Sequence, residues 1–368
     1  MEDTTSEFSG SREVWTGGES SSTIIANYSL ETLTYYPYED DDEDKPLQLN
    51  IHSAATTVGG NIVSNDFDMT GIMIWAASHL LCQYCSCSTS TLGKYVIELG
   101  CGCGLVGIAA MKSPHRPLPD LWVSTDIDPV ALSICRKNFA INNSRIQNNN
   151  AAADAEKTQK ANEKSSPFGE DKNTVWVESL PWGDDDKINK ILNKLQGYAN
   201  AKATANNSNS NNNKEKTSSC TKFDSVVAAD IVYPSTCGET LKNMFRTVDL
   251  LLQPTGTFYL SFATRDGPKT PMKLVQTASQ AGFAIDCLPP LRASVAKRLP
   301  PLLDSKILVM KRSSNASKWN ESLGAEDCHV FPRLRASWAR LFEDPSSSEE
   351  EWEAPIGVID SEDDEGES

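Results

Sequence analysis

Short apolar runs alternate with amphipathic stretches between residues 94 and 312. Seven runs predict buried strands: YVIEL from Tyr95, LWVSTDI from Leu121, VWVES from Val175, FDSVVAAD from Phe223, GTFYLSFAT from Gly256, FAIDCL and KILVMK. Helical spacing of apolar residues marks LVGIAAMK, PVALSICRKNFAINN, GETLKNMFRTVDLLL and PMKLVQTASQAG between them. Almost wholly apolar strands joined by helices predict an α/β fold with a mostly parallel sheet covered on both faces. A proline-rich loop joins the last two strands, which would pair as a hairpin at one edge.

Two further elements precede this series. LQLNI predicts a short strand, and TGIMIWAASHLLCQYC predicts a helix from about Thr70. Thr70 is a suitable N-cap, because its hydroxyl can accept a hydrogen bond from a backbone N–H of the first turn. The stripe of this helix would consist of Ile74, Trp75, Ala77, Ser78 and Leu81.

Composition divides the chain into three parts. We expect a flexible acidic arm over residues 1–45, a folded domain over residues 46–312, and an acidic tail over residues 313–368 with one amphipathic piece, FPRLRASWARLFED. Two stretches rich in Asn, Ala, Ser and Lys, residues 147–172 and 199–221, are expected to be surface inserts. The formal net charge of −16 comes from the ends, since residues 39–44 hold six acids and residues 343–368 hold twelve acids and no base.

The remaining composition argues against several classes of protein. No dense basic stripe with interleaved aromatic residues is present, so no nucleic-acid surface is evident. No apolar signal segment opens the chain, and no run approaches the roughly 18 apolar residues of a membrane span. We expect a monomer in the cytosol or nucleus whose ten cysteines are mostly free thiols. The cluster CQYCSC (Cys82, Cys85 and Cys87) has no partner pair with zinc spacing, which favours ordinary thiols over a metal site.

The segment YVIELGCGCGLVGIAA carries the strongest chemical signal. Its glycines fit an E-x-G-x-G-x-G turn that begins at Glu98 and also a dinucleotide pattern, G-x-G-x-x-G, that begins at Gly102. Such a turn between a strand and a helix places a ligand against bare backbone and the free N–H groups of the helix start. Asp126 ends the next strand, 22 residues after Gly104, where a carboxylate can accept hydrogen bonds from both hydroxyls of a ribose.

Both an NAD site and an S-adenosylmethionine (SAM) site need this arrangement. Glu98 distinguishes them, because a negative charge inside the turn would repel a pyrophosphate and tolerate a cationic sulfonium. A dehydrogenase would also need a second catalytic domain, and the sequence shows none. The residues therefore favour SAM.

The stretch ELGCGCGLVG from Glu98 resembles the first motif of seven-strand SAM-dependent methyltransferases. More narrowly, three other stretches resemble the protein-lysine methyltransferase branch (methyltransferase family 16 type). TGIMIWAASHLLCQY is similar to its preceding helix, SLPWG to its Leu-x-Trp-Gly segment, and AADIVY to its Asp-x-x-Tyr/Phe signature. The resemblance covers residues 46–312 without the inserts. It implies a Rossmann-like, mostly parallel seven-stranded sheet with helices on both faces and an antiparallel last strand.

The resemblance also implies a set of cofactor-binding residues: Trp75, Glu98, Gly100, Cys101, Gly102, Asp126, Trp182 and Ala229. In this set Asp126 would hold the ribose, Trp182 would flank the adenine, and Trp75 would close the pocket. The glycine turn and Ala229 would contact SAM through backbone. Asp128 is an alternative ribose acid, and either tryptophan can instead be a core aromatic.

The resemblance further implies that Asp230 and Tyr233 act on the acceptor, a lysine side chain of a protein substrate. Asp230 would hold the ammonium group and orient it, and Tyr233 would wall the channel and hydrogen-bond the amine; a helix-capping acid and a core tyrosine are the alternatives. The segment reads DIVY and lacks the Asn/Asp-Pro-Pro-Tyr form of enzymes for planar amide or base nitrogens, which argues against DNA, RNA-base and glutamine substrates. Two other functions stay open: a same-fold methyltransferase for another protein nitrogen or a small molecule, and a binding module without catalysis.

Overall fold

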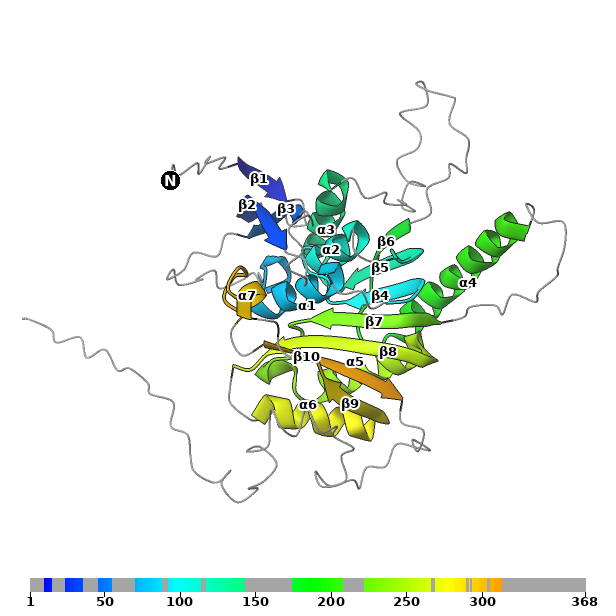
Figure 1. Ribbon diagram of the computed structural model, residues 1–368. Coiled ribbons are helices and arrows are strands. Elements are labelled where there is room, and N and C mark those ends of the chain that lie inside the picture. Colours follow the sequence, from blue (N-terminus) through cyan, green and yellow to red (C-terminus); the bar gives the residue numbers. More distant parts are fainter. Residues whose placement is uncertain are drawn as a thin grey trace, which may run out of the picture.

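The computed structural model describes residues 10–14, 24–35, 46–54, 70–87, 92–113, 117–142, 174–207, 222–265, 269–288, 291, 293–302 and 305–312. Within these ranges the strands form a three-stranded sheet and a seven-stranded sheet (Figure 1). No helix in the described ranges is long and apolar enough to cross a membrane.

The larger sheet confirms the predicted α/β architecture. Its spatial order is β6 (Thr174–Ser179), β5 (Leu121–Asp126), β4 (Tyr95–Leu99), β7 (Phe223–Ala229), β8 (Leu252–Ala263), β10 (Ser305–Arg312) and β9 (Phe283–Cys287). The pairs from β6 to β8 are parallel, whereas β10 is antiparallel to both β8 and β9. The strand order reverses between β4 and β7, and in open α/β sheets a ligand crevice lies outside the carboxyl ends of the strands at such a point.

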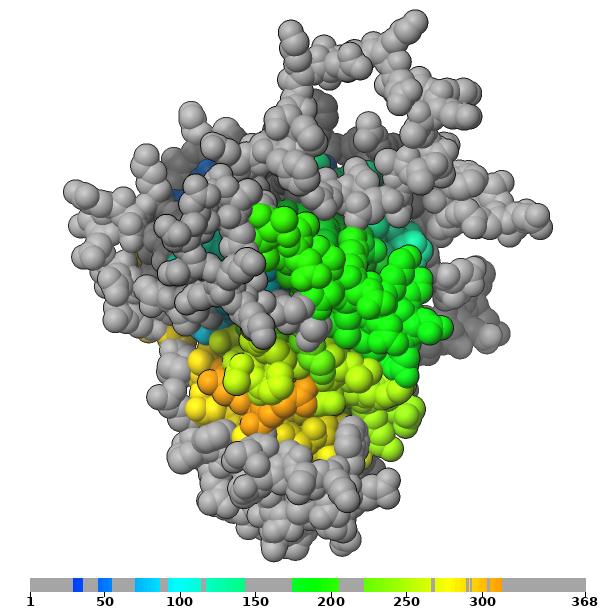
Figure 2. Space-filling model, turned by 90° about the vertical axis from the view of Figure 1, so that its right-hand side faces the viewer, coloured from blue at the N-terminus to red at the C-terminus, as the bar shows by residue number. Residues whose placement is uncertain are grey.

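Helices cover both faces of this sheet (Figure 1). One face carries α1 (Ala76–Cys87), α2 (Leu105–Lys112) and α3 (Pro129–Ile141); the other carries α4 (Asp185–Asn207), α5 (Glu239–Leu251) and α6 (Lys269–Gln280). Successive strand residues point to opposite faces of the sheet. Val96 therefore packs in the core that faces α1, α2 and α3, and Ile97 packs in the core that faces α4, α5 and α6. The surface of α4 forms much of the face shown in Figure 2, in green. A short helix, α7 (Ala293–Ala296), precedes β10.

The smaller sheet is antiparallel and consists of β1 (Gly10–Val14), β2 (Ile24–Tyr35) and β3 (Leu47–Ala54). The strand predicted at LQLNI is confirmed as β3, but the expectation of a flexible arm is wrong for residues 10–14 and 24–35. Leu49 and Ile51 of β3 are fully buried in the core that α1, α2 and α3 share. The side chain of Asn138 in α3 donates to the His52 carbonyl and accepts from the His52 N–H, so side-chain hydrogen bonds as well as packing hold the small sheet.

Two other expectations need correction. The α-helix predicted from Thr70 begins at Ala76, and Thr70–Ile72 form a 3₁₀ helix, η1. The indole N–H of Trp75 donates to the Thr70 carbonyl at 2.9 Å and joins this turn to the helix start. The insert predicted from residue 199 is also wrong over its first part, because α4 continues to residue 207.

The missed helix α4 is explained by its composition. Ile188, Ile191 and Leu195 are buried at helical spacing, but Asn and Lys fill the other faces and resemble low-complexity sequence. The rest of that insert, the insert at 147–172 and the tail with FPRLRASWARLFED lie outside the described residues.

Candidate functional site

A cavity of about 830 Å³ lies where β4, β5 and β7 end, next to the reversal of strand order. It brings together every site residue that the sequence predicts: Trp75, Glu98, Gly100, Cys101, Gly102, Asp126, Trp182, Ala229, Asp230 and Tyr233. These residues come from five separate stretches of the chain, and the sheet aligns them because the carboxyl ends of parallel strands meet at one edge.

The glycine turn forms one wall of the cavity. Gly100 and Gly102 have φ angles of 63° and 52°, which L-residues with a side chain rarely adopt. A Cβ on Gly102 would lie 2.9 Å from the Gly71 carbonyl oxygen, and one on Gly100 would lie 2.6 Å from Cγ2 of Ile231. The Cys101 N–H donates to the Thr125 carbonyl at 2.8 Å and fixes the turn against β5. At Gly100 and Gly102 the turn therefore presents bare backbone and has no room for a side chain.

Asp126 and Asp128 have different local roles. Asp126 accepts the Gly102 N–H through Oδ2 at 2.9 Å and the Asp128 N–H through Oδ1 at 3.0 Å. Asp128 caps α3 by accepting the Val130 N–H at 2.8 Å. Burial raises the pKa of Asp126, and the two backbone donors oppose that rise. Each carboxylate oxygen has two lone pairs, so Asp126 can still accept hydroxyl groups. Its bond to the Gly102 N–H fixes Asp126 beside the glycine turn, which favours it over Asp128 as the ribose acid.

Glu98 lies behind the turn and requires a correction. Its side chain accepts from the Ser124 hydroxyl at 2.9 Å and from the Trp122 indole N–H at 3.2 Å, and the residue is only 2% exposed. Burial raises the pKa of Glu98 to about 8. Near neutral pH the group is mostly protonated, so the predicted charge argument from Glu98 does not hold. The charged carboxylates on this side of the cavity are those of Asp126 and Asp128.

Apolar side chains supply flat walls. Trp75 and Trp182 are both partly exposed on the cavity, so neither is a fully buried core aromatic. Ile127 lines the same cavity and is 69% exposed, although it stands between two acids. A large exposed apolar side chain in a pocket wall favours a ligand with an apolar face, such as a nucleobase. The sequence analysis missed Ile127, and its only signal was an apolar residue directly after the strand-ending acid.

Asp230 and Tyr233 lie beyond the end of β7, the strand that pairs with β4. Asp230 has φ 56°, and its side chain is 0% exposed. Its two oxygens accept from Nη1 and Nη2 of Arg265 at 2.7 and 2.6 Å, so Asp230 is an ion-pair partner and not a helix cap. Tyr233 is 36% exposed, so it is not a core tyrosine; it precedes the 3₁₀ helix η2 (Pro234–Thr236).

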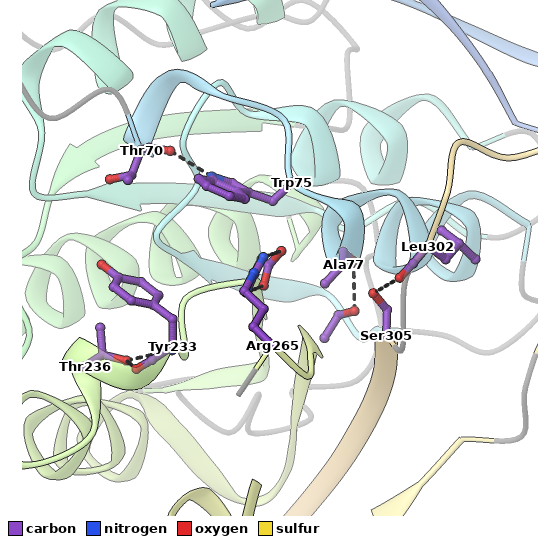
Figure 3. A network of polar contacts seen from close by, with 10 residues as sticks. Thr70, Trp75, Ala77, Tyr233, Thr236, Arg265, Leu302 and Ser305 are labelled. Atoms are coloured by element: carbon purple, nitrogen blue, oxygen red, sulfur yellow. Dashed lines mark hydrogen bonds and ion pairs between the residues drawn. The ribbon is translucent and has the colours of Figure 1, made fainter. Parts of the chain in front are cut away.

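Arg265, which follows β8, is a second cavity residue that the sequence analysis missed. Its guanidinium carbon lies 5.2 Å from the centroid of the Trp75 ring while its fork pairs with Asp230. Figure 3 shows Trp75, Arg265 and Tyr233 gathered around the same space. The sequence signal was a lone base directly after an apolar strand, SFATR. The expectation that Asp230 is free to hold an ammonium ion must be revised, because a guanidinium already pairs with it.

The lining of the cavity suits a cationic, partly apolar ligand. Four acids and one base, Arg265, are present among the described residues that line it. Arg265 offsets Asp230, and burial protonates Glu98 near neutral pH, so Asp126 and Asp128 leave the turn side negative. No group of three metal-ligating side chains gathers in the described part of the chain.

Residues 61–167 match the family model described as lysine methyltransferase. That match, with the glycine cradle and Asp126 at the strand end, identifies a SAM-dependent methyltransferase whose cofactor is SAM. The bare-backbone turn and the negative ribose side fit this cofactor, which carries a sulfonium and no pyrophosphate. Among curated proteins, none matches this sequence.

Several solved structures resemble this chain at low identity and low TM-score. The ribosomal protein L11 methylase of Lactobacillus delbrueckii subsp. bulgaricus is 16% identical, with 64% of this chain and 77% of that chain covered and a TM-score of 0.35. A TehB-like SAM-dependent methyltransferase of Corynebacterium glutamicum is 13% identical, with 66% and 90% covered and a TM-score of 0.35. The precorrin-6y C5,15-methyltransferase of Geobacter metallireducens is 14% identical, with 76% and 100% covered and a TM-score of 0.36. At these values the likeness carries no functional argument.

Proposed function

We propose that the methyltransferase acts on a lysine side chain of a protein substrate, in the cytosol or nucleus. The observation that carries this proposal is the meeting of Asp230 and Tyr233 with the glycine turn in one cavity. The description of the matched family supports the choice of lysine. The segment DIVY also lacks the two prolines typical of sites for planar nitrogens, which favours an aliphatic amine.

The residues of the turn side would hold SAM. The backbone of Gly100, Cys101 and Gly102 would contact its amino-acid part, and Asp126 would accept from the ribose hydroxyls. Bound SAM supplies a methyl group on a sulfonium, and the S–C bonding pair stays on sulfur as the N–C bond forms. The apolar walls would exclude water from the reacting atoms.

Asp230 and Tyr233, beyond the end of β7, would bind and orient the acceptor amine. A lysine amine has an ordinary pKa of about 10.4, so it must lose a proton before its lone pair can attack. Asp230 would accept one amine N–H, since each of its oxygens keeps a lone pair beyond those used by Arg265. Tyr233, which is partly exposed at the cavity, would restrict where the methylene groups of the lysine side chain can lie. Orientation of this kind places the nitrogen about 3 Å from the methyl carbon.

The test is transfer of a radiolabelled methyl group from SAM into proteins of a cell extract. A labelled band that protease removes and nuclease does not, with methyl-lysine after acid hydrolysis, supports the proposal and gives the size of the acceptor. Methyl-histidine or a labelled N-terminus would favour another protein nitrogen. Label confined to small molecules would favour a small-molecule enzyme, and SAM binding without any transfer would favour a binding module.

Substitution Asp230→Ala should lower transfer by at least about 100-fold, because the acceptor nitrogen loses its orienting group. SAM binding, measured by calorimetry, should remain measurable, because both Asp230 oxygens bond to Arg265 and not to the glycine turn. Asp230→Asn keeps an accepting oxygen and is the matched control, with a smaller loss expected. Equal loss of transfer and SAM affinity in Asp230→Ala would assign the residue to the cofactor.

A further inference from the structure

The bidentate pair of Arg265 and Asp230 determines the charge on the acceptor wall. The Asp230 side chain is fully buried, and both of its oxygens accept from one guanidinium. Arg265 is 28% exposed and also lies over the Trp75 ring, so it is held from two sides. Asp230 adopts a left-handed backbone conformation, and its N–H donates to the Ser261 carbonyl at 2.7 Å, which directs the carboxylate toward Arg265.

A free carboxylate at this position would oppose the reaction. It would bind a lysine as its ammonium ion and raise the pKa of that amine by about 1 to 3 units. At pH 7.4 only about one lysine in a thousand carries a neutral amine, so a further rise would remove most of the reactive form. The ion pair of Asp230 and Arg265 has little net charge. Its carboxylate can therefore accept an amine N–H without favouring the ammonium form of the lysine.

We propose that Arg265 is a positioning residue that occupies Asp230, so that the acceptor amine enters the site neutral and not as a trapped ammonium ion. This inference rests on the proposed lysine substrate. Arg265 acts through Asp230, and it needs no contact with the reacting atoms.

Other titratable side chains line the same cavity and must be identical in all the proteins that are compared. They are Glu98, Cys101, Cys103, Asp126, Asp128 and Tyr233. Glu98 in particular titrates near pH 8. Every variant below keeps all six, so their titration is common to the profiles being compared.

The first measurement is independent of activity. The probe is butylamine, an analogue of the lysine side chain that is cationic at pH 7, added to the protein with bound S-adenosylhomocysteine. Arg265→Gln should be stabilised in thermal unfolding at about tenfold lower butylamine concentration than wild type, because the freed carboxylate binds the cation. The double variant Asp230→Asn/Arg265→Gln should lose this response. Arg246→Gln is the matched control, since Arg246 pairs with the exposed Asp185 at 2.5 Å and does not line the cavity.

The second measurement is the pH dependence of transfer to the labelled acceptor of the extract between pH 6.5 and 9.5. In Arg265→Gln the acid limb should move up by about one pH unit, which is about a tenfold loss at fixed pH on that limb. The double variant should return the limb to its wild-type position. Arg265→Lys, which keeps the charge and loses the fork, should give a smaller shift in the same direction and serves if Arg265→Gln does not fold.

The outcomes separate the two proposals. An identical butylamine response in wild type and Arg265→Gln, or a response that persists in the double variant, overturns the role of Arg265. A loss of transfer that is equal at every pH also overturns it, because a merely structural role predicts that result. Absence of methyl-lysine in wild type would overturn the lysine substrate, and the butylamine titration would still decide whether Arg265 keeps cations from Asp230.

Discussion

Glu98 should make the stability of the protein fall as the pH rises. Its carboxyl group is 2% exposed and has a pKa of about 8, against an ordinary value of 4.5. Between these pH values the folded state holds a proton that the unfolded chain has lost, so raising the pH favours unfolding. The loss amounts to about 1.4 kcal/mol per pH unit, or roughly 5 kcal/mol from pH 4.5 to pH 8. Below pH 4.5 both states are protonated, and the contribution vanishes.

Substitution Glu98→Gln should remove this dependence. The amide has nearly the shape of the protonated acid, and its oxygen can still accept from Ser124 and Trp122. The assay is urea unfolding of both proteins without cofactor from pH 5 to pH 9, followed by tryptophan fluorescence. The difference in free energy of unfolding between variant and wild type should grow by several kcal/mol across this range, in favour of the variant.

The comparison cancels every other titrating group, because both proteins share them. Glu178→Gln is the control: Glu178 is partly exposed and pairs with Lys194 at 2.5 Å, so its removal should change stability by less than about 1 kcal/mol. A difference between Glu98→Gln and wild type that stays constant from pH 5 to pH 9 would refute the reasoning, since it would mean that the folded state does not retain the proton.

Two further predictions concern the glycine turn. Gly102→Ala should weaken SAM binding at least about tenfold in calorimetry, because φ is 52° and the new Cβ would meet the Gly71 carbonyl at 2.9 Å. The control Gly197→Ala, in open space on α4, should stabilise the fold slightly and leave SAM binding unchanged. Equal losses of SAM affinity in the two variants would contradict the argument. Asn138→Ala should cost about 2 to 4 kcal/mol in urea unfolding and also weaken SAM binding, because Asn138 donates to the carbonyls of both His52 and Cys103. Asn142→Ala, which removes bonds to Asn50 but none to the turn, should cost stability without weakening SAM binding.

The sequence predicts the larger sheet well, because most of its strands are mainly apolar runs. Periodicity places β4, β5 and β7 to within a residue or two, and the glycine turn and Asp126 follow directly. The sequence prediction fails where only one face of a helix or strand is buried and the exposed face has the polar composition of a linker. Helix α4 is one case, since Asn and Lys hide the buried Ile188 and Leu195. Strand β2 is another, because it carries several polar residues and precedes the acidic run at residues 39–44.

The sequence predicts which residues form the site, but it does not predict the charges that they carry. All ten residues proposed from the sequence line one cavity, because motif residues follow the carboxyl ends of adjacent strands. The protonation of Glu98 depends on burial beside Trp122 and Ser124, which no local pattern contains. The partner of Asp230 is 35 residues away and belongs to no motif.

These partners of the carboxyl groups give the cofactor side and the acceptor side of the cavity different net charges. On the turn side, Asp126 and Asp128 are held by backbone N–H donors, which stabilise negative charge and suit a cationic cofactor. On the acceptor side, Arg265 cancels Asp230, which suits an amine that must arrive without its proton. Glu98 lies behind the turn and is mostly protonated near neutral pH, so it adds little negative charge there. Methyl transfer to a lysine needs one cation held and another excluded, and four carboxyl groups within one cavity can meet both needs only because their partners differ.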